Sequence, residues 1–194
     1  CNKTYAYVML NIDDLKRDAI MQPYYHGLGC IRVKTSREIT YSFYSKEHTP
    51  AESMYVHTHQ TEIHSTMLAG RYKNIVYDYT ISDEPTNWCL QEIQCQGGTE
   101  PVLLHENVNL IQKESTIIDK EFTHGHNIFH DLELLDDIVV TKCFFNYNKS
   151  SKTAKVIRNK SIDYVCGLSN MGNPKENWEL IEMMINVSMD RSKV

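Results

Sequence analysis

The sequence predicts a mainly β domain, a barrel or sandwich of short strands with a short helix near the N-terminus and another at the C-terminal end. From Cys30 onward, short segments alternate apolar and polar residues with the period of two typical of half-buried strands. Turn-forming residues separate these segments at close spacing. The 194 residues suit one domain with a complete core, so we expect a single domain over 1–194, with its barrel at about 28–160.

Both helices are predicted from capping and spacing. Asn11–Ile20 opens with an N-cap candidate and carries acids before bases, which favours a short helix. Asn173 and Pro174 fit the N-cap and N1 positions of a second helix, at about 173–190. Apolar residues recur there at helical spacing: Trp178, Ile181, Met184 or Ile185, and Met189. We expect this stripe to pack on the barrel.

The predicted strands cover the middle of the chain. They are Cys30–Lys34, Ile39–Tyr44, Ser53–His59, Ser65–Leu68, Tyr72–Tyr79, Val102–Leu104, Val108–Gln112, Ser115–Asp119, Ile138–Tyr147 and Ala154–Arg158. The turns between them are predicted at Ala69-Gly70, Ser82–Pro85, Gly97-Gly98 and Asn146–Ser151.

Charge and hydropathy argue against two classes of partner. The net charge is −5, and the basic residues between Lys149 and Lys160 are interrupted, as on a solvated hairpin, so we expect no nucleic-acid partner. No apolar run approaches the roughly 20 residues that span a bilayer, so we expect no membrane partner.

The six cysteines predict neither a zinc ribbon nor a disulfide framework. They are dispersed without a Cys-x-x-Cys pair, at Cys1, Cys30, Cys89, Cys95, Cys143 and Cys166. In a domain of this size we expect reduced thiols and a cytoplasmic location.

Two groups of histidines predict a metal site. His57 and His59 end a predicted strand, where residues two apart point to the same face, as two ligands of one ion require. About 70 residues later come His124, His126 and His130. We expect one of these to be the third ligand, with His130 favoured over His126, and the others to be supporting or exposed.

The spacing around these histidines resembles the cupin superfamily. Its first motif is His-x-His followed by a strand that ends in Gly, here His57-Thr-His59 through Gly70. Its second motif places a ligand histidine shortly before a strand, here Phe122–Asp137 before Ile138–Phe145. The resemblance covers about residues 50–147. It implies a double-stranded β-helix, the jelly-roll barrel, and a homodimer is an expectation from the same family.

Within the cupins, the chain is most similar to the thiol dioxygenases, a group that includes the cysteine and cysteamine dioxygenases. Tyr77-Asp78-Tyr79 matches their Tyr-Asp-aromatic signature, and Gly125-His-Asn-Ile-Phe-His130 resembles the context of their third ligand, with one extra residue. This likeness implies Fe(II) held by three histidines, with O2 and a small thiol as substrates. Ni, Mn, Cu and Zn also suit imidazole ligands.

One departure opens further ligand candidates. The first cupin motif often has a glutamate between its histidines and its glycine. The interval from His57 to Gly70 is one residue shorter here than in the family, so either His64 or Ile63 occupies the position of that glutamate. His64 is then a candidate fourth ligand. Alternatively, Glu62 would complete a face of two histidines and one carboxylate, which suits Fe(II) oxygenases.

Other candidate residues follow from their places near the motifs. The resemblance favours Tyr77 and Tyr147 as catalytic groups in the pocket, with Tyr79 and Cys143 as further neighbours. Arg71 and Arg158 could bind a substrate carboxylate, although a surface position is favoured for each.

Three functions remain open from the sequence. The first is a metal-dependent oxygenase acting on a small molecule, with thiol dioxygenation as its most specific form. The second is a non-catalytic cupin that binds or senses a small molecule, and the third is a cupin isomerase or lyase. Fold alone does not choose among them.

Overall fold

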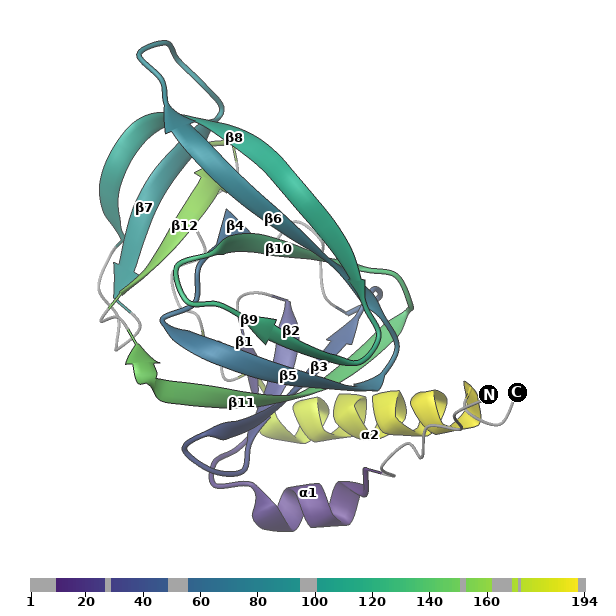
Figure 1. The fold of residues 1–194 in the computed structure, drawn as a ribbon. Coiled ribbons are helices and arrows are strands. Elements are labelled where there is room, and N and C mark those ends of the chain that lie inside the picture. The colour runs from purple at the N-terminus through teal and green to yellow at the C-terminus, as the bar shows by residue number, and fades with distance from the viewer. Residues whose placement is uncertain are drawn as a thin grey trace.

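The computed structural model describes residues 10–26, 29–48, 56–94, 101–150, 153–161, 169–170 and 172–191. It confirms a mainly β fold with two helices (Figure 1). In chain order the elements are α1 (Ile12–Asp18), β1 (Tyr24–His26), β2 (Cys30–Lys34), β3 (Ile39–Ser45), β4 (Val56–His57), β5 (Thr61–Ala69), β6 (Tyr72–Ile81), β7 (Trp88–Gln94), β8 (Val102–Ile118), β9 (Glu121–His124), β10 (Phe129–Leu134), β11 (Ile138–Ser150), β12 (Thr153–Asn159), β13 (Ser169–Asn170) and α2 (Pro174–Arg191).

The strands form one open sheet and one closed barrel. The open sheet has seven strands in the order β13-β1-β2-β3-β11-β5-β9. The barrel has six strands in the order β10-β4-β12-β7-β8-β6, and every pairing in both is antiparallel. Figure 1 shows β6 and β10 between the rest of this barrel and strands β5, β9 and β11 of the open sheet.

The chain crosses repeatedly between the two sets of strands. β4 belongs to the barrel, β5 to the open sheet and β6 to the barrel, and β8 to β12 alternate in the same way. Such alternation winds the chain as a two-stranded ribbon, which is how a jelly roll is built. In these two stretches, strands that follow one another in the chain therefore lie on opposite sides of the space between the open sheet and the barrel.

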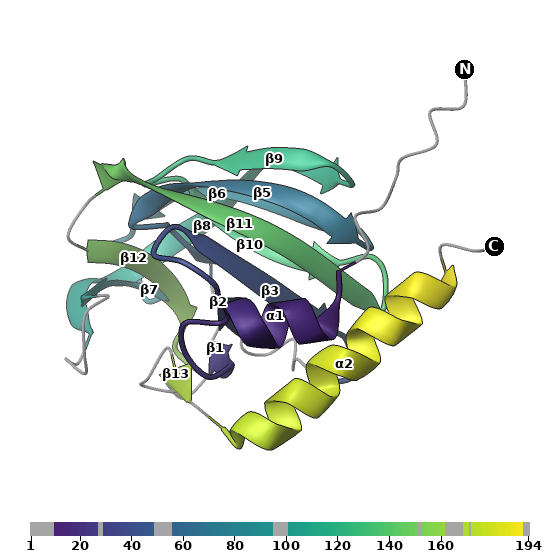
Figure 2. The same cartoon turned by 90° about the horizontal axis from the view of Figure 1, so that it is seen from below.

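Both helices cover the open sheet on the face away from that space. Figure 2 shows α1 and α2 on one side, against β1, β3 and β11. Ile181 and Met184 of α2 are fully buried and pack in one cluster with Phe43 of β3. The predicted apolar stripe of the C-terminal helix therefore packs on the sheet. The predicted caps are also confirmed: Asn11 Oδ1 accepts from the amide of Asp13 at 2.7 Å, and Asn173 Oδ1 accepts from that of Lys175 at 3.1 Å.

The strand predictions are right in kind and incomplete in extent. The three short strands predicted between Val102 and Asp119 are one continuous strand, β8, whose pairing contains register shifts instead of turns. Five strands were not predicted: β1, β7, β9, β10 and β13. β11 runs on to Ser150, so the turn predicted at Asn146–Ser151 is wrong over its described residues, which belong to a strand. Gly97-Gly98 lies outside the described residues.

The predicted turn at Gly70 is confirmed and requires glycine. Its φ is +69°, in the left-handed region that other residues avoid. A Cβ atom here would also clash with the carbonyl oxygen of Ile138. Gly70 thereby directs the chain from β5 in the open sheet to β6 in the barrel.

Cys30, Cys89 and Cys143 are buried and free, while the other three cysteines lie outside the described residues. Neither helix in the described part of the chain combines the length and apolar character needed to cross a bilayer.

Candidate metal centre

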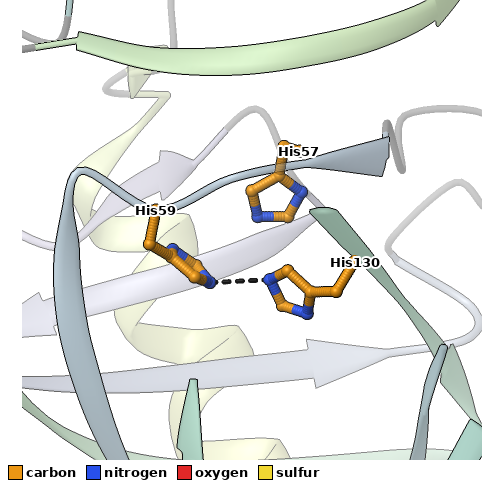
Figure 3. A group of neighbouring side chains, drawn as sticks. All are labelled: His57, His59 and His130. Atoms are coloured by element: carbon orange, nitrogen blue, oxygen red, sulfur yellow. Dashed lines mark hydrogen bonds between the residues drawn. The ribbon is translucent and has the colours of Figure 1, made fainter. Parts of the chain in front are cut away.

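Three histidines converge between the open sheet and the barrel. One nitrogen from each of His57, His59 and His130 lies within 4.8 Å of the other two. Figure 3 shows the three rings pointing toward one another. Their centroids are 4.7 to 5.0 Å apart, and the Nε2 atoms of His59 and His130 are separated by 2.7 Å. Among the described residues, this is the group of side chains arranged to hold a metal ion.

Strand pairing and a crossing together produce this convergence. His57 on β4 is the direct cross-strand partner of His130 on β10, so their side chains lie next to each other on one face. β4 ends at His57, and Thr58 ties the crossing to β12 by donating its amide proton to the Lys155 carbonyl at 2.8 Å. His59 follows in an isolated bridge and points back to the other two. His57 and His59 therefore point to the same place, although His59 lies beyond the end of β4.

Asn74 fixes the proton on the ring of His130. The Asn74 Oδ1 atom lies 2.7 Å from His130 Nδ1, in a bond that is buried. Since an amide oxygen only accepts, Nδ1 carries the proton and Nε2 keeps its lone pair. That lone pair faces His59. This is the support that a metal-binding histidine usually receives from its other nitrogen.

The contact between His59 and His130 is a hydrogen bond whose proton a metal ion could replace. Two imidazole lone pairs repel each other at 2.7 Å, so a proton or a metal ion must lie between them. Metal–nitrogen bonds of about 2.0–2.1 Å place two ligand nitrogens roughly 3.0–3.4 Å apart. The two rings therefore need to separate by only a few tenths of an ångström to accept an ion.

His59 and His130 are held in the neutral form that binds metals. Burial, followed by the charges of neighbouring histidines, lowers the pKa of His59 and of His130 well below the ordinary value of 6.5. A neutral imidazole keeps a lone pair for coordination at neutral pH. The donor set of three imidazoles therefore suits a divalent transition metal.

A half-buried arginine lines the same cavity as the three histidines. Arg32 on β2 lines it from the opposite sheet, and its Nε atom is buried without a hydrogen-bond partner. Burial lowers the pKa of Arg32, but the neighbouring thiols and phenols raise it further, so that the net shift is upward; these groups are Cys30, Tyr44, Tyr24 and Cys143. No ion pair joins Arg32 to a carboxylate within the described part of the chain, so its positive charge is available to a ligand.

The structure does not bring the other candidate ligands to this group. His64 is exposed on the far face of β5, with Nδ1 2.9 Å from Thr123 Oγ1 and Nε2 3.3 Å from a carboxylate oxygen of Glu62. Glu62 also accepts from Asn146 Nδ2 at 3.3 Å. Ile63 lines the cavity in their place, because alternate residues of a strand face opposite sides. His126 is exposed in the crossing between β9 and β10.

The two candidate catalytic tyrosines also lie elsewhere. Tyr77 packs beside the core cluster of Phe129, on the face of β6 opposite Asn74. The Tyr147 hydroxyl donates to the carbonyl oxygen of Arg37 at 3.2 Å, and the residue is 37% exposed. Neither lines the cavity, whereas Cys143 does.

The two arginines named from the sequence are not on the cavity wall. Arg71 is exposed and forms a two-pronged ion pair with Asp136 at 3.0 and 3.1 Å. Arg158 on β12 is half-buried and does not line the cavity. The surface position favoured for Arg71 is therefore confirmed, and the cavity arginine is Arg32.

Sequence reasoning missed two cavity residues and left the role of a third open. Arg32 alternates with Ile31 and Val33, which would normally place it on a solvated face, but helices cover the other side of this sheet. Tyr72 carries no motif and is 2% exposed in the wall. His124 lies in the wall as well, with its ring centroid 4.7 Å from that of His130.

Comparisons with known proteins provide no family assignment. No protein-family model matches the chain, and no curated protein matches its sequence. Function must therefore be argued from the site itself.

Proposed function

We propose that this chain is a cupin-type metalloenzyme that binds one divalent transition-metal ion through His57, His59 and His130. The observation that carries the proposal is the convergence of three imidazoles, with His130 fixed by Asn74 so that its Nε2 lone pair faces the other two. We further propose Fe(II) as the resident ion and oxygenation of a small molecule as the reaction, with a thiol as the leading substrate.

Three neutral protein ligands support an oxygenase because they leave coordination positions open. A bound Fe(II) ion would supply the place where a substrate thiolate and O2 can meet and exchange electrons. The chain's own residues bind and orient the substrate and restrict the access of water. Ile63 and Leu132 contribute apolar surface to the cavity wall for that purpose.

Arg32 indicates the substrate class. Its Nε atom is buried without a hydrogen-bond partner, which costs folding free energy unless a ligand accepts its proton. Its fork of donors matches a carboxylate or a similar planar oxyanion. We therefore propose that the substrate carries an anionic group, which Arg32 holds while the reacting group faces the histidines.

The leading alternative is a cupin that binds an anionic ligand through the metal without turnover. The same three histidines and Arg32 would serve it equally well. A cupin isomerase or lyase is the third function, and it would not consume O2. Oxygen consumption therefore separates the first function from the other two.

The experiment has two parts. Protein purified anaerobically and loaded with Fe(II) is first analysed for metal, and we expect one equivalent. Oxygen uptake is then measured with small thiols that carry a carboxylate, and with their uncharged counterparts. We expect uptake with the anionic thiols. One equivalent of iron without oxygen uptake would remove the oxygenase and leave a binding protein.

Matched variants show which residues hold the metal. His57→Ala, His59→Ala and His130→Ala should each lose most of the bound metal, because three ligands cannot become two without a large loss of affinity. His64→Gln and Glu62→Gln lie on the far face of β5 and should retain one equivalent. Metal loss from His64→Gln with retention in His59→Ala would overturn the assignment.

A further inference from the structure

Tyr72 and His124 form a buried pair beside the three histidines. Tyr72 lies on β6 and His124 ends β9, so the two come from the barrel and the open sheet. The tyrosine hydroxyl is 3.0 Å from His124 Nε2, and the two rings stack at 19°. Both side chains line the cavity that contains the metal group.

The pair has one proton more than its own hydrogen bond uses. A neutral phenol and a neutral imidazole carry one polar proton each. One proton forms the bond between them. The other must be donated elsewhere, either from His124 Nδ1 or from the Tyr72 hydroxyl.

Within the described part of the chain, the second proton has no protein acceptor. The single hydrogen bond of each side chain is the one that they share. The remaining contacts of His124 are with rings: Phe122 at a centroid distance of 4.8 Å, His130 at 4.7 Å and His59 at 5.5 Å. Both side chains line the cavity, so this donor is suited to a ligand bound there.

His124 stands beside the metal group without joining it. Its ring is as close to His130 as the rings of the group are to one another. However, its Nε2 atom is engaged by Tyr72, and its nitrogens lie outside the set that converges within 4.8 Å. The pair therefore lines the cavity beside the three histidines without being one of the metal ligands.

We propose that Tyr72 and His124 act as one hydrogen-bond donor to a small anion bound at the open coordination position of the metal. This inference rests on the metal centre proposed above. The ligand class is an anion or a group with an exposed lone pair, such as a thiolate, a carboxylate or azide. The pair orients that ligand and adds to its affinity, while the three histidines alone determine the affinity for the metal.

The test uses cobalt and azide as probes. Co(II) replaces the native ion, and its visible absorption reports both metal binding and the arrival of azide. The measured quantities are the dissociation constants of Co(II) and of azide. Neither depends on turnover, so the test does not require that the enzyme reaction be known.

The key variant is Tyr72→Phe/His124→Phe, which removes both protons and keeps two aromatic rings. We expect its azide affinity to fall by about ten-fold or more, as for a lost hydrogen bond to a charged group, with Co(II) affinity unchanged within about two-fold. Tyr72→Phe alone should weaken azide by about three-fold or more. This milder variant decides the matter if the double variant does not fold.

Matched controls remove a hydroxyl or an imidazole elsewhere. Tyr41→Phe alters β3 on the sheet face covered by the helices, and His105→Gln alters β8. Both should bind azide as the unaltered protein does.

Four outcomes overturn the inference. Unchanged azide affinity in the folded variants rejects the donor role, and loss of Co(II) from Tyr72→Phe/His124→Phe would make His124 a ligand instead. A Co(II) protein that binds no azide has no open position for the pair to serve. Failure of the unaltered protein to bind Co(II) rejects the metal centre itself, and the inference with it.

Discussion

Asn74 Oδ1 lies 2.7 Å from His130 Nδ1 and thereby determines which nitrogen of His130 can bind a metal. Both residues are nearly inaccessible to solvent, on adjacent strands β6 and β10. The bond links a residue outside any histidine motif to the proposed centre. Its removal is the most specific perturbation of the site that leaves all three ligands in place.

Asn74→Ala is predicted to weaken metal binding by about 10–100-fold, because the ring of His130 loses its orientation and its fixed proton. Competition with a chelator of known affinity measures the change. Asn109→Ala, at an exposed position of β8, is the control and should bind as the unaltered protein does. Equal affinities in the two variants would show that Asn74 does not support the centre.

Arg32→Met is predicted to weaken the binding of anionic ligands without destabilising the fold. A half-buried cation that lacks a carboxylate partner does not stabilise the folded state, and an apolar side chain of similar length can fill its space. Thermal unfolding should occur at an equal or higher temperature. A loss of more than about 2 kcal/mol in unfolding free energy would instead give Arg32 a structural role.

The pH dependence of stability should reveal His26, a half-buried residue of β1. Burial, followed by the charges of Arg32 and His57, holds the pKa of His26 well below 6.5. As the pH falls through 6.5, His26 therefore becomes protonated in the unfolded chain but stays neutral in the folded chain. Stability from this residue is complete above pH 6.5 and falls with decreasing pH, by about 1.4 kcal/mol per pH unit, until the folded pKa is reached.

Urea unfolding between pH 7 and pH 5, in the presence of a chelator, measures this slope. In His26→Gln, the unfolding free energy should depend less steeply on pH, by the amount that corresponds to one proton. This difference does not depend on the stability of the variant at pH 7. A variant slope equal to that of the unaltered protein would mean that His26 is protonated in the folded state.

Gly70→Ala is predicted to destabilise the fold by at least about 2–3 kcal/mol, because the left-handed backbone and the Ile138 carbonyl both oppose a side chain. Gly172→Ala is the matched control. Gly172 has a φ of +58°, but the nearest atom to its Cβ would be 3.4 Å away, so the cost should be about 1 kcal/mol. Equal losses of unfolding free energy would show that the clash at Gly70 relaxes without cost.

Local patterns predicted the helix caps, the Gly70 turn and many of the strands, because these depend on neighbouring residues. The same patterns missed β9 and β10, which contain His124 and His130 amid polar residues. Pairing with β5 and β6, distant in sequence, stabilises these strands. The single long strand β8 was divided for a similar reason, since bulges within a paired strand resemble turns.

For the metal site, too, local patterns identified some residues and missed those whose position depends on distant parts of the chain. The spacing of His57 and His59, together with family resemblance, identified the group and favoured His130. Strand alternation alone could not decide whether Ile63 or His64 faces inward, because the sequence interval is one residue shorter than in the family. Arg32 could not be found at all, since its placement depends on the helices that cover the opposite face of its sheet.

The most direct test of the metal centre is a crystal structure of the metal-loaded protein with an anomalous difference map at the absorption edge of the bound metal. We predict one peak per chain, bonded to nitrogens of His57, His59 and His130, with Asn74 still bonded to His130. A peak at other residues, or no peak between these three rings in protein that contains one equivalent of metal, would contradict the account.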